Sequence, residues 1–265
     1  VAIGDDMPAV DAGGAGSSRP QPSEIALART EYTGTETPVE MVNWGLAAEW
    51  ADSLGADLIH SSVAYQAFDD PYPDLTYAQL NGHTTDISRP AEIAASKGIL
   101  VVNSVGNSGA SGIFPWLLAP ADVNGESLIA VGAVDASGTA ASFSSIGPSA
   151  HGRIKPDLVA RGVGNPFPSA SGNPTQYESN NGTSFSAPLV SGLAACLLQA
   201  RPQWAAVDVI RPLRETASQA STPDNRRGYG LPNGGAALAW QARFGAAEPG
   251  HARLLGRNPL VIGGA

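Results

Sequence analysis

A serine at the start of a long apolar segment is the residue in this chain best placed to act as a nucleophile. Residues 181–188 read NGTSFSAP, and Ser184 opens a predicted helix over residues 184–200. The unpaired N–H groups of a helix N-terminus and the helix dipole stabilise an anion there. Gly182 permits a tight turn before the serine, and Pro188 falls in the first turn, where its missing N–H costs little. The arrangement suits acyl transfer through Ser184, and an N-cap serine is the structural alternative.

An asparagine at the end of a predicted buried strand suits the stabilisation of that anion. Residues 99–105 (ILVVNSV) form a nearly continuous apolar segment, typical of a strand buried on both faces. Gly106 and Asn107 follow it. The side-chain amide of Asn107 could donate to a developing oxyanion together with the Ser184 N–H. A turn-forming asparagine is the alternative.

His60 is the candidate general base. Residues 56–64 (ADLIHSSVA) predict a strand with a polar C-terminal half, and period-two alternation puts His60 on the same face as Ser62. A histidine hydrogen-bonded beneath the cleft is the structural alternative. His83 and His151 lie in predicted loops and are less suited to the role of base.

Strands and helices alternate along most of the chain. We predict strands over residues 24–30, 56–64, 99–105, 128–134 and 156–160, and helices over residues 42–54, 87–96, 184–200 and 206–216. This alternation predicts an α/β fold with a mostly parallel sheet, helices on both faces, and the active site outside the carboxyl ends of the strands. We expect an irregular segment over residues 1–23, a partial catalytic domain over residues 24–244, and a linker or tail over residues 245–265.

The composition argues against several classes of partner. The 265 residues carry a net charge of −9, whereas nucleic acids and anionic membranes require basic patches. The single cysteine, Cys196, excludes a disulfide framework and a cysteine-based metal site within the chain. The apolar stretch over residues 189–198 is too short to span a bilayer and predicts a buried helix. No signal peptide is visible, and the chain starts at Val1, so we expect a mature form or a fragment.

Three aspartates in a predicted loop could bind a cation. Asp69, Asp70 and Asp74 lie close together in the sequence, as calcium ligands do. Their spacing matches no specific template, and we expect solvated loop acids instead. A structural calcium ion is the one cofactor that the sequence leaves open.

Taken together, these motifs resemble the subtilase family of subtilisin-like serine peptidases. Residues 182–188 resemble the family's Gly-Thr-Ser-x-Ser-x-Pro signature, and residues 99–109 resemble the strand that ends in its oxyanion asparagine. Further resemblance lies in residues 128–135, 141–164 and 228–230. It covers about residues 24–240, and the pattern is most similar to subtilases of Bacteroidetes-like bacteria. The resemblance implies a three-layer subtilisin-like fold, Ser184 as nucleophile, Asn107 as oxyanion donor and a secreted or extracellular location.

The resemblance also implies a cleft for a peptide or ester substrate. Ser62-Val63-Ala64 resembles the stretch that pairs with the substrate main chain as an added strand. Ser104-Val105-Gly106 would form a wall of the primary specificity pocket. The apolar residues in the loop expected below that pocket favour an apolar substrate side chain, and a place in the hydrophobic core is the structural alternative. They are Ile113, Phe114, Trp116 and Leu117.

The chain departs from the family's order of Asp, His and Ser. It contains no His-Gly-Thr motif. Residues 1–6 (VAIGDD) resemble the strand that bears the family's Asp, with Asp5 near its end. However, the stretch from Asp5 to Ala26 is too short to hold both the His-bearing helix and a further strand. Three explanations stay open. The chain is N-terminally truncated, or His60 has taken over as base, or a second copy or partner chain supplies the missing elements through an exposed sheet edge.

Two classes of function follow from these observations. In subtilisin, loss of the catalytic histidine lowers kcat by about 2 × 10⁶-fold. Substrate binding and the oxyanion hole alone still accelerate the reaction by about 10³–10⁴-fold over the reaction in water. We therefore expect a serine hydrolase that cleaves activated esters better than peptides, because the amine leaving group needs a general acid. The rival is an inactive binding module that keeps the cleft and the strand-pairing edge, or a remnant of the enzyme.

Overall fold

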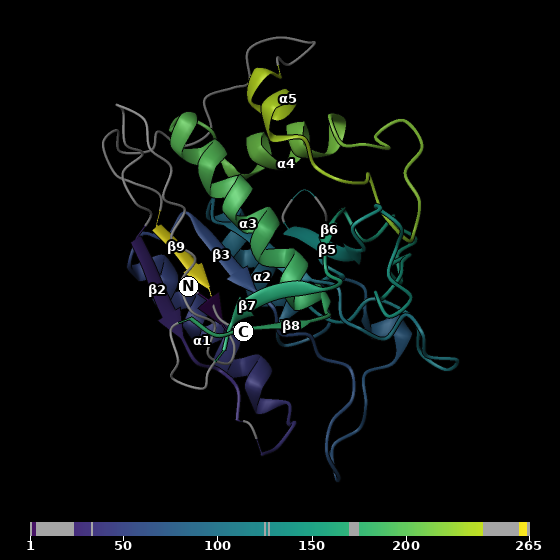
Figure 1. Ribbon diagram of the computed structural model, residues 1–265. Helices are drawn as coiled ribbons and strands as arrows, with labels where there is room; N and C mark the ends of the chain where they lie inside the picture. Colours follow the sequence, from purple (N-terminus) through teal and green to yellow (C-terminus); the bar gives the residue numbers. More distant parts are fainter. Residues whose placement is uncertain are drawn as a thin grey trace.

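Short apolar segments form a seven-stranded sheet at the centre of the molecule (Figure 1). The computed structural model describes residues 2–3, 24–32, 34–124, 126, 128–169, 175–240 and 260–263. The strand order is β1-β2-β9-β3-β4-β5-β6, and every pairing is parallel. The strands are β1 (Ala2–Ile3), β2 (Glu24–Ala28), β3 (Leu58–Ser61), β4 (Leu100–Ser104), β5 (Leu128–Val134), β6 (Leu158–Arg161) and β9 (Leu260–Gly263).

Helices cover both faces of the sheet, because the central strands are apolar on both sides. All residues of β3, β4 and β5 are buried. Ile59 of β3 packs into a core with α1 (Val39–Ser53) and α2 (Ser88–Ser96), whereas its neighbour Leu58 packs into a second core on the opposite face. That second core contains α3 (Thr183–Ala200), α4 (Ala206–Glu215) and α5 (Gly234–Ala239). The predicted three-layer α/β fold is confirmed.

Two short strands from distant parts of the sequence share one position in the sheet. β9 pairs with β2 at Glu24–Leu27 and with β3 at Leu58 and Ile59. Farther along the same two strands, Ala2 of β1 pairs with Leu27 and with His60. β9 and β1 therefore lie end to end between β2 and β3. Both fall in segments that were predicted to be irregular or linker, and the rest of those segments lies outside the described residues.

The sequence patterns missed an antiparallel hairpin that precedes α3. β7 (Asn165–Pro168) pairs with β8 (Tyr177–Asn180), and the hairpin lies beside the N-terminal end of α3 (Figure 1). All four residues of β8 are exposed, so the segment has no apolar alternation by which to recognise a strand. The 3-10 turn η1 (Tyr77–Gln79) and α5 were also not predicted.

The central helix α3 packs across the front of the sheet in Figure 1. Its length and composition would suffice to cross a membrane, but half of it is buried inside the fold. Ala187, Val190 and Ala194 are among the residues that bury it against the sheet. α3 is the buried helix that the apolar stretch predicted.

A buried ionic network joins β6 to α4. Lys155 donates to Asp157 over 2.8 Å, and Arg214 of α4 binds the other carboxylate oxygen. The side chains of Lys155 and Asp157 are 1% and 0% exposed. Burial alone would raise the pKa of Asp157, but the charges of Lys155 and Arg214 offset this and hold its pKa below the ordinary value. Asp157 therefore stays ionised in the core.

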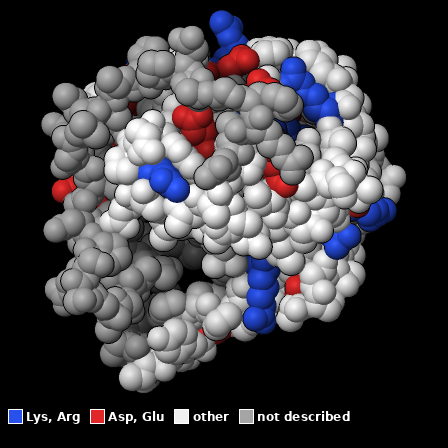
Figure 2. All heavy atoms as spheres, turned by 90° about the horizontal axis from the view of Figure 1, so that it is seen from above, with Lys and Arg blue, Asp and Glu red and all other residues white. Residues whose placement is uncertain are grey.

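Charged side chains are scattered over the face drawn in Figure 2. Lys and Arg lie singly among acidic and neutral residues there. Among the described residues of this face, no continuous basic surface forms, and an extended polyanion would need one.

Candidate active site

The predicted nucleophile and oxyanion donor lie together at the carboxyl ends of the central strands. Thr183, at the N-terminus of α3, donates to Asn107 Oδ1 through its backbone N–H at 2.9 Å and through its hydroxyl at 3.0 Å. Ser62, which follows β3, donates from its hydroxyl to the carbonyl oxygen of Ser184 at 3.3 Å. Segments far apart in the sequence thus converge around Ser184.

The backbone before Ser184 needs glycine. Gly182 is the N-cap residue of α3, with a φ of 155°, and its N–H donates to the carbonyl of Gly162 at 2.8 Å. A Cβ on Gly162 would lie 2.4 Å from that of Ala133, so the turn packs directly onto β5. Ser184 is half-buried and lies in the first turn of α3. Its N–H is one of the helix-terminal donors without an intrahelical acceptor.

Asn107 is held in a defined orientation. Its Oδ1 accepts both hydrogen bonds from Thr183, so its Nδ2 is left on the opposite branch of the amide. The residue is exposed, and its Nδ2 has no hydrogen-bond partner in the part of the chain that the structure describes. An exposed amide donor beside a helix N-terminus is the arrangement that stabilises an oxyanion.

His60 lies beneath this site, between two hydroxyl groups. Its Nδ1 is 3.0 Å from Ser191 Oγ, and its Nε2 is 3.2 Å from Ser62 Oγ. Ser191 and Ser62 each have one hydroxyl proton, and each hydroxyl also lies within hydrogen-bond distance of a carbonyl oxygen, that of Ala187 at 3.0 Å and that of Ser184 at 3.3 Å. The neutral imidazole therefore donates to one of the two serines and accepts from the other. The predicted common face of His60 and Ser62 is confirmed by their hydrogen bond.

The environment of His60 keeps the imidazole neutral. Burial lowers its pKa to about 3. Both ring nitrogens are engaged by hydroxyls, and within the described residues no hydrogen bond joins the imidazole to the Ser184 side chain. The structure therefore brings His60 to Ser62, and only through Ser62 to Ser184.

The other candidate bases lie elsewhere. His83 and His151 are exposed, with ring centroids 6.0 Å apart, and neither has a hydrogen bond to Ser184 or Asn107 among the residues that the structure describes. Asp5 lies outside the described residues.

The predicted substrate-pairing segment is fixed from below. Ser104 donates from its hydroxyl to the carbonyl of Ser62 at 3.1 Å, and Asn103 Nδ2 donates to the carbonyl of Val63 at 3.0 Å. The main-chain N–H and carbonyl of Ala64 have no partner in the described part of the chain. Ala64 is half-buried, so these groups suit pairing with an incoming extended strand.

The loop below the predicted specificity pocket divides into core and surface. Leu117 is fully buried in the core, as the structural alternative for these residues allowed, whereas Ile113 is 90% exposed. Phe114 and Trp116 are half-buried and pack edge to face at 5.3 Å. A Cβ on Gly106 would lie 2.6 Å from Leu118 Cγ, so Leu118 lies directly against that pocket wall.

The loop aspartates serve as hydrogen-bond acceptors for the backbone. Asp69 Oδ2 accepts from the Glu36 N–H at 2.9 Å, and Asp74 Oδ1 accepts from the Phe68 N–H at 3.0 Å. The exposed Asp69 thus ties its loop to the segment before α1, and the exposed Asp74 orders the loop itself.

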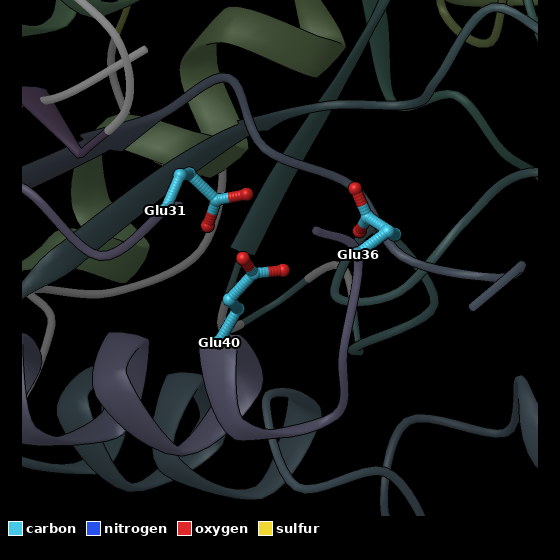
Figure 3. A group of neighbouring side chains, drawn as sticks. All are labelled: Glu31, Glu36 and Glu40. Carbon is cyan, nitrogen blue, oxygen red and sulfur yellow. The ribbon is translucent and has the colours of Figure 1, made fainter. Parts of the chain in front are cut away.

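The acids that do gather are glutamates, which the sequence patterns did not single out. Carboxylate oxygens of Glu31, Glu36 and Glu40 lie within 4.8 Å of one another, and the three side chains point toward one another in Figure 3. Glu40 is fully buried and accepts from the N–H groups of Tyr32 and Thr37 at 3.0 and 3.2 Å. Burial, together with the neighbouring carboxylates, raises the pKa of Glu36 to about 7.

A groove of about 790 Å³ lies between β2 and α1, away from Ser184. Its wall includes Leu27, Thr30, Leu46 and Trp50. Neither Ser184 nor Asn107 lines it, so it is not the cleft that the motifs predicted.

Three residues support the site without having been predicted. Thr183 fixes Asn107, Asn103 fixes Val63, and Ser191 forms a hydrogen bond with His60 Nδ1. Ser191 stands two helical turns after Ser184, and Asn103 is the only polar residue inside an apolar strand before Ser104. Both residues can be seen in the sequence, but their contacts with His60 and Val63 follow only from the packing of the helices and strands.

Known proteins share much of this sequence. The sequence profile of the subtilase family matches residues 26–230. The chain is 34% identical over 192 residues to subtilisin BL of Lederbergia lenta, an alignment that covers 71% of this chain and 59% of that protein. It is equally identical to an alkaline protease of Alkalihalobacillus alcalophilus, of which 42% is covered. The chain thus spans about half the length of the curated relatives it matches.

Solved structures share the fold. MycP1 from the ESX-1 type VII secretion system superposes with a TM-score of 0.61 at 22% identity, covering 85% of this chain and 66% of MycP1. The PatG macrocyclase in complex with peptide superposes with a TM-score of 0.58 at 22% identity, covering 75% and 56%.

Proposed function

Because the chain belongs to the subtilase family, we propose that it provides the nucleophile and the oxyanion hole of a subtilisin-like serine hydrolase. The single observation that carries this proposal is the double hydrogen bond from Thr183 to Asn107 Oδ1. It fixes an exposed amide donor beside the helix N-terminus that holds Ser184. The relatives show the family, and the roles of the individual residues belong to the proposal.

The chemistry is acyl transfer to Ser184. Ser184 Oγ attacks the carbonyl carbon of the substrate, a new C–O bond forms, and the hydroxyl proton passes to a base. The carbonyl oxygen becomes an oxyanion that accepts from Asn107 Nδ2 and the Ser184 N–H. Collapse of this intermediate breaks the bond to the leaving group, which departs with a proton. Water then attacks the acyl-enzyme in the same way and releases the acid.

His60 is the proposed base within the described residues, acting through Ser62. Its Nε2 lies 3.2 Å from Ser62 Oγ, and Ser62 Oγ lies 3.3 Å from the main-chain carbonyl oxygen of Ser184, so the Ser184 hydroxyl must first rotate to Ser62 before its proton can pass to His60. A base with a pKa of about 3 holds a proton weakly at neutral pH, so it assists both proton removal and leaving-group protonation poorly. Activated esters, whose leaving groups need no proton, should therefore react faster than peptide bonds.

The substrate we propose is an extended acyl chain, peptide or ester, that pairs with Ser62-Val63-Ala64. The unpartnered main-chain groups of Ala64 support this mode, which reads backbone rather than side chains. An apolar side chain would face Ser104-Val105-Gly106, where Leu118 makes the wall apolar and limits its depth. The family resemblance also supports an extracellular location for this chain.

A second candidate function is that of a binding module with little turnover. The observation that favours it is the low pKa of His60, because a buried neutral imidazole without a direct hydrogen bond to Ser184 leaves the nucleophile weakly activated. The same cleft would then bind an extended peptide without cleaving it.

Covalent labelling with a fluorophosphonate probe separates the two functions. We expect the full chain to be labelled, Ser184→Ala to lose labelling, and His60→Asn to slow it. Ser186→Ala is the matched control, because Ser186 lies on the same helical turn and its buried hydroxyl has no hydrogen-bond partner among the residues that the structure describes. Absence of labelling in the wild-type chain, combined with saturable binding of an extended peptide, would favour the binding module.

The substrate class is tested in parallel. Hydrolysis of a p-nitrophenyl ester should exceed that of a peptide p-nitroanilide with the same acyl group, and Ser184→Ala should remove both. Equal ester hydrolysis by the wild type and Ser184→Ala would refute the proposal that Ser184 carries the reaction.

A further inference from the structure

Two histidines from separate loops face each other on the surface, away from the proposed active site. His83 lies in the turn that precedes α2, and His151 lies in the turn that precedes β6. Their ring centroids are 6.0 Å apart and the ring planes are inclined at 46°. Both residues are exposed, and the proposed function uses neither of them.

The backbones of both histidines are anchored to the same part of the fold. The His83 N–H donates to Asn81 Oδ1 at 3.0 Å, and the N–H of Ala150, next to His151, donates to the carbonyl of Leu80 at 3.0 Å. The neighbouring Gly82 is tied to Asp122 Oδ2 at 2.6 Å. The distance between the two loops is therefore set by hydrogen bonds that do not involve the imidazoles.

Glu92 of α2 fixes the tautomer of His83. Its Oε2 lies 2.9 Å from His83 Nδ1, and since a carboxylate can only accept, Nδ1 carries the proton. Nε2 of His83 is then the nitrogen with the lone pair, and it has no protein partner among the described residues. A carboxylate behind one ring nitrogen, with the other nitrogen open, is how proteins orient a metal-binding histidine.

The spacing of the rings suits a shared metal ion. With metal–nitrogen distances of about 2.0–2.1 Å, each ring centroid lies about 3 Å from the metal, and two such rings lie about 5–6 Å apart. The observed 6.0 Å falls at the upper end of this range.

We propose that His83 and His151 bind a divalent transition metal of the zinc class, with Glu92 orienting His83 and water completing the coordination. Imidazole nitrogen favours zinc, copper and nickel over calcium and magnesium, which prefer oxygen. The bound ion joins the loop before α2 to the turn before β6. Because the unfolded chain does not hold the two histidines together, metal binding stabilises the folded state.

Calorimetric titration and thermal unfolding of the full chain with ZnCl₂ test this proposal, in a Cys196→Ser background because the thiol is exposed. We expect one zinc ion per chain and an increase in Tm of roughly 2–6 °C at saturation. His83→Asn and His151→Asn should each abolish both effects. Glu92→Gln should weaken binding by about 10–100-fold while retaining the stoichiometry.

The controls separate this site from others. His251→Asn also removes one imidazole from the chain and should leave binding unchanged, and MgCl₂ should give no shift. Zinc binding that survives in both His83→Asn and His151→Asn, or that is lost in Glu36→Gln instead, would overturn the proposal. Failure to bind zinc at millimolar concentration would overturn it as well.

Discussion

Replacing Thr183 by Val tests whether the orientation of Asn107 matters for catalysis. The substitution keeps the shape of a fully buried side chain and keeps the backbone N–H that donates to Asn107 Oδ1 at 2.9 Å. It removes only the hydroxyl that donates to the same oxygen at 3.0 Å. Asn107 therefore keeps its donor group but loses half of its fixation.

The expected magnitude follows from that single hydrogen bond. A neutral hydrogen bond contributes about 0.5–1.5 kcal/mol, which corresponds to a fall of about 2–12-fold in the rate of acylation. Asn107→Leu removes the donor itself, and in subtilisin the equivalent loss costs about 10²–10³ in kcat. We expect Thr183→Val to lie between the wild type and Asn107→Leu, with the effect in kcat rather than KM, because the oxyanion exists only during reaction.

The assay is hydrolysis of a p-nitrophenyl ester, with the second-order rate constant of fluorophosphonate labelling as an independent measure. Thr216→Val is the matched control, since its hydroxyl bonds the carbonyl of Pro212 away from the site. Circular dichroism at the assay temperature verifies that each variant is folded. An unchanged rate in Thr183→Val, with a strong loss in Asn107→Leu, would refute the role assigned to the Thr183 hydroxyl.

Three further predictions concern stability and binding. Lys155→Met should lower the free energy of unfolding by about 3–5 kcal/mol, because Asp157 loses a buried partner. Lys97→Met removes an exposed ion pair and should lower it by less than about 1 kcal/mol. Urea denaturation of both variants measures the difference. Because the pKa of Glu36 is raised to about 7, the folded state keeps a proton that the unfolded state loses above pH 4.5. The free energy of unfolding should therefore fall as the pH rises from 4.5 to about 7. The expected fall is roughly 1–2 kcal/mol after allowance for solvent screening. Denaturation of Glu36→Gln over the same range should give a flatter profile, and a profile as steep as that of the wild type would contradict the assignment. Asn103→Leu should weaken binding of an extended peptide inhibitor several-fold, measured by its inhibition constant, because the substrate-pairing segment loses a hydrogen bond.

The sequence predicted those elements whose patterns are set locally. The apolar segment over residues 99–105 became β4 (Leu100–Ser104), and the predicted strand over residues 128–134 agrees with β5 (Leu128–Val134) at both ends. α3 begins one residue before its predicted start. In each case continuous apolar character or helical periodicity determines the element before any tertiary contact forms.

The elements that were missed depend on contacts between distant residues. The hairpin β7–β8 is polar and exposed, so no periodicity distinguishes it from a loop. The cluster of Glu31, Glu36 and Glu40 forms because a loop folds back over the start of α1, which sequence spacing does not reveal.

In the candidate site, too, features set by local motifs could be predicted, and features set by contacts between distant residues could not. Local motifs predicted Ser184 and Asn107 as site residues, and Thr183 brings the two together at the carboxyl ends of the central strands. Their catalytic roles stay a prediction. The partners of His60 could not be predicted, because Ser191 reaches it from a helix on another layer. The pKa of about 3 follows from that burial and not from the local sequence.

The strand position shared by β9 and β1 has a consequence for how the chain reaches its native state. Leu58 of β3 pairs with Val261, about 200 residues later, so β2 and β3 leave the ribosome long before β9, which fills the part of the space between them that β1 does not. During that interval each of them presents an unsatisfied edge inside what becomes the middle of the sheet. Such edges recruit strands from other molecules. The vulnerable period in the life of this protein is therefore its synthesis, and a chaperone that shields β2 and β3 at that stage would raise the yield of folded chains without changing the stability of the finished fold.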